Sequence, residues 1–226
     1  MPGTPNSGER PDEDVRLEAM LCFERDAAAR GFQCVAGVDE AGRGPLAGPI
    51  VAGAVVLREP IPGLNDSKLL TEAQREDLFR RLQDGGHAIG CAIVSAEEID
   101  ALGIQSANYA AMLRAVAALT PQPDFLLVDG FSIPGCTTPH LRLVKGDRRS
   151  LSIAAASIIA KVTRDRLMIE LDGRCPGYGF ARHKGYATPE HLEALKRLGP
   201  CPAHRRSFAP LATTLETASL FDPSIT

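Results

Sequence analysis

The chain of 226 residues lacks tryptophan and is poor in aromatic side chains, which make up 5% of the sequence. Alanine and the aliphatic residues must therefore fill the core, and a hydrophobic content of 44% is enough for one sizeable domain. No apolar run approaches the roughly 20 residues that a membrane span requires. The start, MPGTPNSGERPDED, has no basic segment followed by an apolar one, so we do not expect a secretory signal.

Closely spaced cysteines are also missing. The chain has six cysteines, and no two of them form a C-x-x-C pair. A structural zinc site is therefore not expected, because such sites use paired ligands at short spacing. Together with the missing secretory signal, this pattern predicts reduced thiols in a cytoplasmic protein.

A phosphate-binding loop is absent in spite of a glycine-rich stretch. Gly42, Gly44 and Gly48 follow an apolar run, as the glycines of a dinucleotide-binding fingerprint do. That fingerprint must open a helix, whereas Pro49 and the valine-rich residues 51–57 favour a strand. No G-K-[ST] triplet closes the stretch, so the sequence also excludes a Walker loop.

The most informative stretch is an acidic corner between two expected strands. The apolar residues 35–38 lead into Asp39 and Glu40, and a glycine-rich turn then connects them to the second apolar run. Neighbouring side chains of a regular strand point to opposite faces, so the two acids can act together only if the backbone bends at Ala41-Gly42. The alternative is an ordinary solvated turn.

Strands and helices alternate along the rest of the chain, which indicates an α/β core with a small helical C-terminal part. Capping-box patterns predict helix starts at Thr71 and Ser95, and Thr188 followed by Pro189 predicts another. The expected helices are 14–30, 71–84, 95–102, 105–119, 150–171 and 188–199, and the expected strands are 35–38, 51–57, 87–94, 124–130 and 141–145.

Two further acids, Asp129 and Asp147, also follow apolar runs. Strand ends on one edge of an α/β sheet converge, so these acids are expected to meet Asp39 and Glu40. Clustered carboxylates repel one another unless a cation lies between them. Oxygen ligands without histidine or cysteine select Mg²⁺ or Mn²⁺, and two such ions about 3.5–4 Å apart would support phosphoryl transfer.

Charge is distributed unevenly along the chain. The net charge of −3 by itself argues against a nucleic-acid binder. Residues 140–206, however, hold 14 Lys or Arg and only 6 Asp or Glu. This asymmetry indicates one basic surface for a polyanion, and the alternative is a set of ordinary solvated helix faces.

Several motifs that occur in order resemble those of bacterial ribonuclease HII, the type 2 ribonuclease H. The resemblance covers about residues 33–208 and begins with DEAGRGPLAGP at 39–49. The other motifs are NDSK at 65–68, LLVDG at 126–130, KGDRRSLSIAAASIIAKVTRDR at 145–166, YGFARHKGYATPEH at 178–191 and HRRSF at 204–208.

The resemblance implies a ribonuclease H-like fold, in which helices flank a mixed sheet and a small helical segment follows. We expect a disordered tail at 1–13, a catalytic domain at 14–175, a helical substrate-binding segment at 176–212 and a second tail at 213–226. The implied activity is metal-dependent endonucleolytic hydrolysis of the RNA strand in RNA–DNA hybrids. It includes a cut 5′ of a single ribonucleotide in duplex DNA, which leaves 3′-hydroxyl and 5′-phosphate ends and serves ribonucleotide removal. A monomer is expected.

The resemblance assigns catalysis and the binding of two Mg²⁺ or Mn²⁺ ions to four acids. These are Asp39, Glu40, Asp129 and Asp147. Asp165 is a further acid near the site in this family, and the alternative for it is an ion pair with a basic neighbour on the same helix.

The resemblance also implies substrate contacts. Gly42, Arg43 and Gly44 look like the reader of the ribose 2′-hydroxyl, which separates RNA from DNA, and the alternative is that the glycines only form the turn. Tyr186 resembles the tyrosine that stacks on the neighbouring deoxyribose, and the alternative is a core tyrosine. The expected phosphate contacts, each with exposed surface charge as its alternative, are Ser67, Lys68, His183, Lys184, Arg205 and Arg206.

The C-terminal end carries one more pattern. Thr217, Ser219, Leu220 and Phe221 resemble the short peptide by which bacterial proteins bind the replication sliding clamp. The usual leading glutamine is missing. The alternative is a tail that packs Leu220 and Phe221 against the domain.

Two other functions stay open from the sequence. One is a different carboxylate–metal phosphohydrolase on a similar scaffold, and the basic segment argues against a small substrate for it. The other is a nucleic-acid-binding module without catalysis, which the presence of all four acids opposes. Incubation with a DNA duplex that carries one ribonucleotide distinguishes the three.

Overall fold

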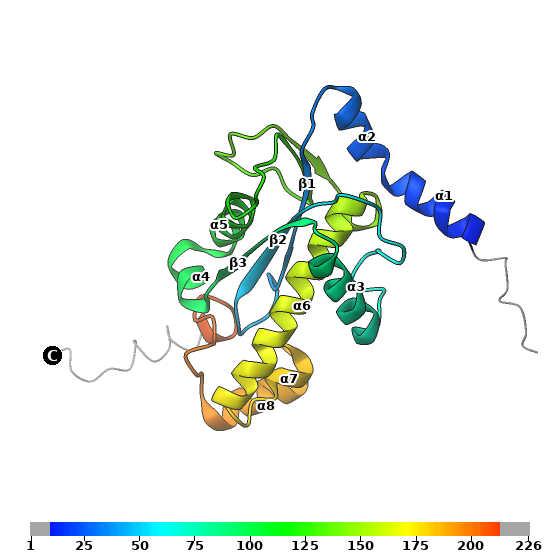
Figure 1. Cartoon of the computed structure of the whole chain (residues 1–226). Helices are drawn as coiled ribbons and strands as arrows, with labels where there is room; N and C mark the ends of the chain where they lie inside the picture. Colours follow the sequence, from blue (N-terminus) through cyan, green and yellow to red (C-terminus); the bar gives the residue numbers. More distant parts are fainter. Residues whose placement is uncertain (1–9, 213–226) are drawn as a thin grey trace, which may run out of the picture. The chain divides into compact units, whose positions relative to one another are not determined.

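A mixed five-stranded sheet forms the centre of the fold, with the strand order β3-β2-β1-β4-β5 (Figure 1). The structure is a computed structural model that describes residues 10–212. Strands β1, β4 and β5 run parallel, with Val38 opposite Val128 and Asp129 opposite Leu143. The strands are β1 (Val35–Ala41), β2 (Ile50–Val56), β3 (Ala88–Val94), β4 (Phe125–Asp129) and β5 (His140–Leu143).

Helices precede, connect and follow these strands. They are α1 (Arg10–Met20), α2 (Cys22–Ala29), α3 (Glu72–Asp84), α4 (Ala96–Leu102), α5 (Ile104–Ala117), the 3-10 turn η1 (Gly146–Arg148), α6 (Leu151–Arg174), α7 (Phe180–His183) and α8 (Pro189–Leu198).

The local sequence signals locate most of these elements to within a few residues. Both predicted capping boxes, at Thr71 and Ser95, are formed, and the Thr188 side chain caps α8 with Pro189 at its first position. The expected N-terminal helix is wrong in detail, because it begins at Arg10 and is divided at Leu21, where ψ is 1°. The short elements η1 and α7 were not predicted, since neither carries a periodic apolar pattern.

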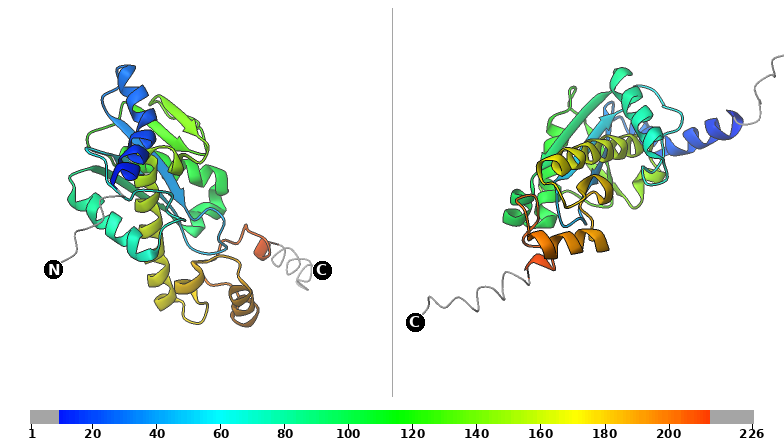
Figure 2. Two further views of the ribbon diagram at one scale, coloured as in Figure 1. Left: turned by 90° about the vertical axis from the view of Figure 1, so that its right-hand side faces the viewer. Right: turned by 90° about the horizontal axis from the view of Figure 1, so that it is seen from below.

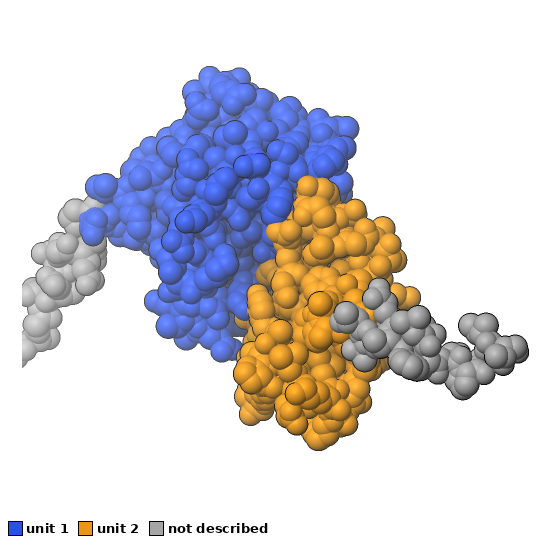
Figure 3. Space-filling view, turned by 180° about the vertical axis from the view of Figure 1, so that it is seen from behind, with its two compact units in different colours: residues 1–40, 52–92, 112–162 blue, residues 41–51, 93–111, 163–226 orange. Residues whose placement is uncertain are grey.

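The chain divides into two compact units (Figure 3). Of the described residues, unit 1 holds 10–40, 52–92 and 112–162, and unit 2 holds 41–51, 93–111 and 163–212. The expected boundary between residues 175 and 176 stays a prediction.

The core of unit 1 forms around the first half of α6. Helix α3 lies beside the first half of α6 (Figures 1 and 2). Met20 of α1, Leu82 of α3 and Val55 of β2 pack with Ile158 of α6 in one buried apolar cluster. Strand β1 approaches the start of α6 so closely that a Cβ at Gly37 would lie 2.0 Å from the Ser152 carbonyl carbon. A side chain at position 37 would therefore push helix and strand apart.

The core of unit 2 is smaller and contains aromatic and histidine rings. Phe180 stacks on Tyr178 with ring centroids 5.2 Å apart, and the cluster also includes Met168 and Ala47. His191 and His204 lie beside these rings and are joined by a hydrogen bond of 3.0 Å between their Nε2 atoms.

All six cysteines lie within residues 10–212, and each is a free thiol in the structure. None of the helices within residues 10–212 is long and apolar enough to cross a membrane.

Candidate active site

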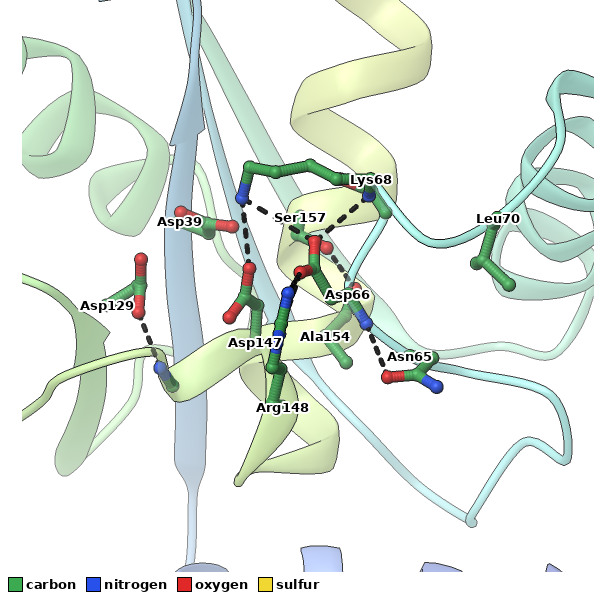
Figure 4. Close-up of polar contacts among 12 residues, drawn as sticks. Asp39, Asn65, Asp66, Lys68, Leu70, Asp129, Asp147, Arg148, Ala154 and Ser157 are labelled. Carbon is green, nitrogen blue, oxygen red and sulfur yellow. Dashed lines mark hydrogen bonds and ion pairs between the residues drawn. The ribbon is translucent and has the colours of Figure 1, made fainter.

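Three of the predicted acids lie at the same edge of the sheet in unit 1. Asp39 is on β1, Asp129 is the last residue of β4, and Asp147 is on η1 shortly after β5 (Figure 4). Val38 is opposite Val128 in the parallel pair. The residues that follow them, Asp39 and Asp129, therefore lie side by side on neighbouring strands. The sheet register thus brings together Asp39 and Asp129, which are 90 residues apart in the sequence.

The charges of these acids act on one another. Burial raises the pKa of Asp39 well above its ordinary value, and the negative charges of Glu40 and Asp129 raise it further. Burial also raises the pKa of Asp129, and the charge of Asp147 adds to this effect. Each ionised carboxylate therefore disfavours the ionisation of its neighbours.

Glu40 also contributes to this cluster, although it follows Asp39 directly. The Glu40 backbone N–H donates a hydrogen bond of 2.7 Å to Asp39 Oδ1. Strand β1 ends at Ala41, and the backbone then turns at Gly42, where φ is +97°. This turn follows both acids, and Asp39 and Glu40 themselves lie within the strand, so their joint action on one pair of ions stays a prediction.

A lysine partly compensates the negative charge. The Lys68 Nζ lies 3.1 Å from Asp147 Oδ2 and 3.5 Å from Asp66 Oδ1 (Figure 4). Burial alone would lower the pKa of Lys68, but the hydrogen bond with Asp147 and the nearby carboxylates outweigh it and raise the pKa. Lys68 is therefore a permanent cation in the acidic cluster.

Sequence reasoning missed Asp66, which has only 2% of its surface exposed. Its Oδ2 accepts hydrogen bonds of 2.9 and 2.8 Å from Arg148, and its Oδ1 accepts one from the Lys68 backbone N–H. Burial raises the pKa of Asp66, but these bonds lower it more, so the acid is held ionised. The sequence signal that could have identified Asp66 is its position in the NDSK motif, next to the selected Ser67 and Lys68.

The donor chemistry of the acids fits a hard divalent ion. No group of three or more acid, histidine or cysteine side chains within residues 10–212 is arranged to hold a metal ion in this structure. The donors are nevertheless all carboxylate oxygens, and the raised pKa of Asp39 and of Asp129 indicates too little positive charge around them. A bound cation would remove that deficit.

The glycine-flanked arginine lies in unit 2 with the expected tyrosine. Gly44 is exposed, Arg43 is half-buried, and a Cβ at Gly44 would lie 3.8 Å from Tyr186 Cε1. The Tyr186 side chain is 48% exposed, so it is a surface ring and not a core tyrosine. Arg43 also donates a hydrogen bond of 3.0 Å to Gln105 Oε1, a contact that the sequence did not predict.

The remaining expected substrate contacts differ in their exposure. Arg206 is exposed, and His183 and Lys184 are half-buried in unit 2. Ser67 is buried in unit 1, where its carbonyl accepts a hydrogen bond from Arg75. Asp165 is half-buried in unit 2, and its charge acts on the buried Arg164 beside it.

Arg205 has no exposed surface, which conflicts with the expected phosphate contact. Its guanidinium group donates hydrogen bonds to the carbonyl oxygens of Gly42, Arg43 and Gly48. The motif alone could not reveal this, because Arg205 and its exposed neighbour Arg206 are the same residue type.

Comparison with known proteins shows the family of this chain. The family model described as Ribonuclease HII matches residues 36–211. The chain belongs to the ribonuclease HII family. It is therefore an endoribonuclease that hydrolyses the RNA strand of RNA–DNA hybrids.

Individual relatives show how far the family likeness extends. Ribonuclease HII of Geobacillus thermodenitrificans is 57% identical over 206 residues, which cover 90% of this chain and 79% of that protein. The crystal structure of ribonuclease H2 from Pyrococcus horikoshii OT3 has a TM-score of 0.67 at 30% identity, covering 84% of this chain and all of that one. The RNase HII in the PCNA:RNase HII complex from Archaeoglobus fulgidus has a TM-score of 0.65 at 27% identity and covers 78% and 95%. The expected ribonuclease H-like fold is confirmed.

Proposed function

We propose that this ribonuclease HII also cuts duplex DNA on the 5′ side of a single embedded ribonucleotide. The products would be a 3′-hydroxyl and a 5′-phosphate, and the role would be ribonucleotide removal. The observation that carries the proposal is the set of acids gathered from β1, β4 and η1 at one sheet edge, with the pKa values of Asp39 and Asp129 raised. The expected monomeric state stays a prediction.

The acids would hold Mg²⁺ or Mn²⁺ with Asp39, Glu40, Asp129 and Asp147 as ligands. When bound, such ions supply an activated water and stabilise the leaving oxygen of an in-line displacement. The chain's own contribution is to fix the carboxylates. The Gly146 N–H donates a hydrogen bond of 2.6 Å to Asp129 Oδ1, and Lys68 holds Asp147. Asp165 is proposed to tune the site rather than to bind an ion.

Selectivity for the ribonucleotide is assigned to residues of unit 2. Backbone groups at Gly42, Arg43 and Gly44 would contact the 2′-hydroxyl, because glycine lets a sugar approach the main chain. The exposed ring of Tyr186 would stack on the adjacent deoxyribose. Ser67, Lys68, His183, Lys184 and Arg206 would contact phosphates and position the duplex.

A cleavage assay tests the proposal. A DNA duplex with one ribonucleotide should be cut 5′ of that ribonucleotide with Mg²⁺ or Mn²⁺, and the all-DNA duplex should stay intact. Asp129→Asn should lose activity about 1000-fold, because it removes one metal-binding carboxylate. The control Asp77→Asn alters an exposed acid on α3 and should cut normally. Normal cutting by Asp129→Asn would contradict the assignment.

Contact with a sliding clamp is proposed separately. The clamp-like residues Thr217, Ser219, Leu220 and Phe221 lie outside the described residues. The solved complex of PCNA with RNase HII from Archaeoglobus fulgidus supports the proposal. Binding of a peptide spanning 213–226 to a bacterial clamp is the measurement, and undetectable binding at high peptide concentration rejects the contact.

A further inference from the structure

Two arginines are the largest fully buried side chains among the described residues. Arg164 on α6 is 1% exposed and Arg205 is 0% exposed, and both belong to unit 2. Burying a guanidinium group removes its hydration, which destabilises the fold unless other groups replace the lost water. A chain that buries two such groups within one small unit needs a physical reason to keep them.

The two guanidinium groups donate seven hydrogen bonds to backbone carbonyl oxygens. Arg205 donates to Gly42 at 2.5 Å, to Arg43 at 2.9 Å and to Gly48 at 2.8 and 3.0 Å. Arg164 donates to Ala47 at 3.2 Å, Pro49 at 2.9 Å and Lys184 at 2.9 Å. Five of the six accepting residues lie in the loop 42–49, which contains the glycine-flanked arginine.

These bonds decide which way the loop's peptide groups face. The peptide bonds at 42–43 and 43–44 are trans, and a trans peptide directs its C=O and its N–H to opposite sides. Because Arg205 draws the carbonyls of Gly42 and Arg43 toward itself, the N–H groups of Arg43 and Gly44 are directed away from it. Gly44 is the exposed residue of this pair and lies next to Tyr186.

The same contacts exclude other residues at position 42. A Cβ at Gly42 would lie 2.0 Å from Arg164 Nε, and φ at Gly42 is +97°. Arg164 also joins the loop to the carbonyl of Lys184, two residues before Tyr186. The two arginines therefore hold together the parts of unit 2 that are proposed to contact the ribonucleotide.

We propose that Arg205 and Arg164 are positioning residues for ribonucleotide selectivity. By binding the inward carbonyls of the loop 42–49, they orient the Arg43 and Gly44 amides toward the 2′-hydroxyl of the substrate. This inference rests on the proposed function. The burial cost agrees with it, since burial and the charge of Arg164 lower the pKa of Arg205 to about 9.

The test uses variants that keep or remove charge. Arg205→Lys and Arg164→Lys keep a cation but lose the planar fork that reaches several carbonyls, and Arg205→Met removes both. The matched control is Tyr178→Phe, which removes a partly buried hydrogen bond of 2.6 Å to the Gly199 carbonyl, outside the loop but in the same unit. Each variant is compared with the wild type at a temperature where thermal denaturation shows that it is folded.

Two measurements separate positioning from mere stability. The first is affinity, without divalent ions, for a duplex with one ribonucleotide and for the same all-DNA duplex, together with kcat and KM for cleavage. The second is amide hydrogen exchange of the peptide containing residues 42–49 in the free protein. Arg205→Lys and Arg205→Met should both lower kcat at least 10-fold and abolish the affinity preference for the ribonucleotide. Affinity for the all-DNA duplex should stay within 2-fold, and exchange in 42–49 should rise.

Each outcome decides the inference. Tyr178→Phe should keep the wild-type preference and kcat. If the folded Arg205→Lys variant keeps both, with unchanged exchange in 42–49, the positioning role is wrong. If Arg205→Lys does not fold, Arg164→Lys is judged by the same preference and the same exchange. Failure of the proposed function would appear in the wild type, as no cut 5′ of the ribonucleotide, whereas failure of this inference appears only in the variants.

Discussion

Unit 1 buries carboxylates, whereas unit 2 buries guanidinium groups. In unit 1, Asp39, Asp66 and Asp147 are each at most 5% exposed, and burial raises the pKa of Asp39. In unit 2, Arg164 and Arg205 are at most 1% exposed, and burial lowers the pKa of both. The two units thus bury charges of opposite sign.

The two kinds of charge are compensated differently. The carboxylates of unit 1 meet movable partners, such as the Lys68 ammonium group, and they can also accept a proton or an ion. The arginines of unit 2 donate hydrogen bonds to backbone carbonyl oxygens, which are fixed in the main chain. Partners that can move away suit carboxylates that are proposed to bind ions. Backbone carbonyls that stay in place suit a loop that must keep its shape.

The largest test of this comparison is Asp39→Asn in unit 1. Activity should fall about 1000-fold, because one of the proposed metal-binding carboxylates is lost. The melting temperature without divalent ions should rise, because the amide carries no charge in a site that raises the pKa of Asp39. Thermal denaturation and the cleavage assay measure both effects in one preparation. A lower melting temperature would show that the charge of Asp39 does not destabilise the folded protein.

Divalent ions should stabilise unit 1, because they would supply the positive charge that its clustered carboxylates lack. At about 100 times its dissociation constant, Mn²⁺ should add about 2.7 kcal/mol to the free energy of unfolding. Asp129→Asn should lose most of this gain, and the exposed-acid control Asp77→Asn should keep it. Urea denaturation with Mn²⁺ and with a chelator gives the comparison. An equal gain in Asp129→Asn would place the ion elsewhere.

Unit 2 should respond to acid, because it cannot accept another buried positive charge. Burial and the neighbouring His191 lower the pKa of His204 to about 4, below the ordinary value of 6.5. His204 therefore binds a proton near pH 6.5 in the unfolded chain, but only near pH 4 in the folded chain. Stability is present above pH 6.5 and falls by about 2 kcal/mol as the pH drops to 4.5.

The variant His204→Gln isolates this acid effect. Urea midpoints at pH 7 and pH 4.5 should differ less in the variant than in the wild type, because glutamine does not titrate. His191 faces the same cluster, burial also lowers its pKa, and it would supply the remaining dependence. Identical losses in both proteins would assign the acid sensitivity to other groups.

The smallest effect concerns a carboxylate of unit 1 that is held by neutral donors. Glu24 on α2 accepts hydrogen bonds from the Ser152 hydroxyl at 2.6 Å and from the Ser152 N–H at 3.0 Å. Ser152→Ala removes the hydroxyl bond and should cost about 1 kcal/mol without changing kcat. The urea midpoint measures this loss. A loss several times larger would mean that the charge of Glu24, like that of Asp39, destabilises the fold when its partners are removed.

The sequence predicted the local features of both units well. Caps at Thr71, Ser95 and Thr188 depend on side chains only three residues away, so the pattern contains its own partner. The acids at 39, 40, 129 and 147 were predicted to meet because the carboxyl ends of parallel strands share an edge, and the register of β1 and β4 puts Asp39 next to Asp129 at that edge. The metal ligation and the substrate contacts stay predictions.

Burial and long-range partners were decided only by the tertiary structure. Arg205 was expected at the surface, yet it donates to Gly42, which is 163 positions away in the sequence. Asp66 was not selected, since an acid in a loop gives no sign that Arg148 will reach it. Residue types determined which groups can carry charge and where strands and helices begin, because those preferences act over a few bonds. Which of those charges lose their water depends on how distant segments pack, and no local pattern contains that information.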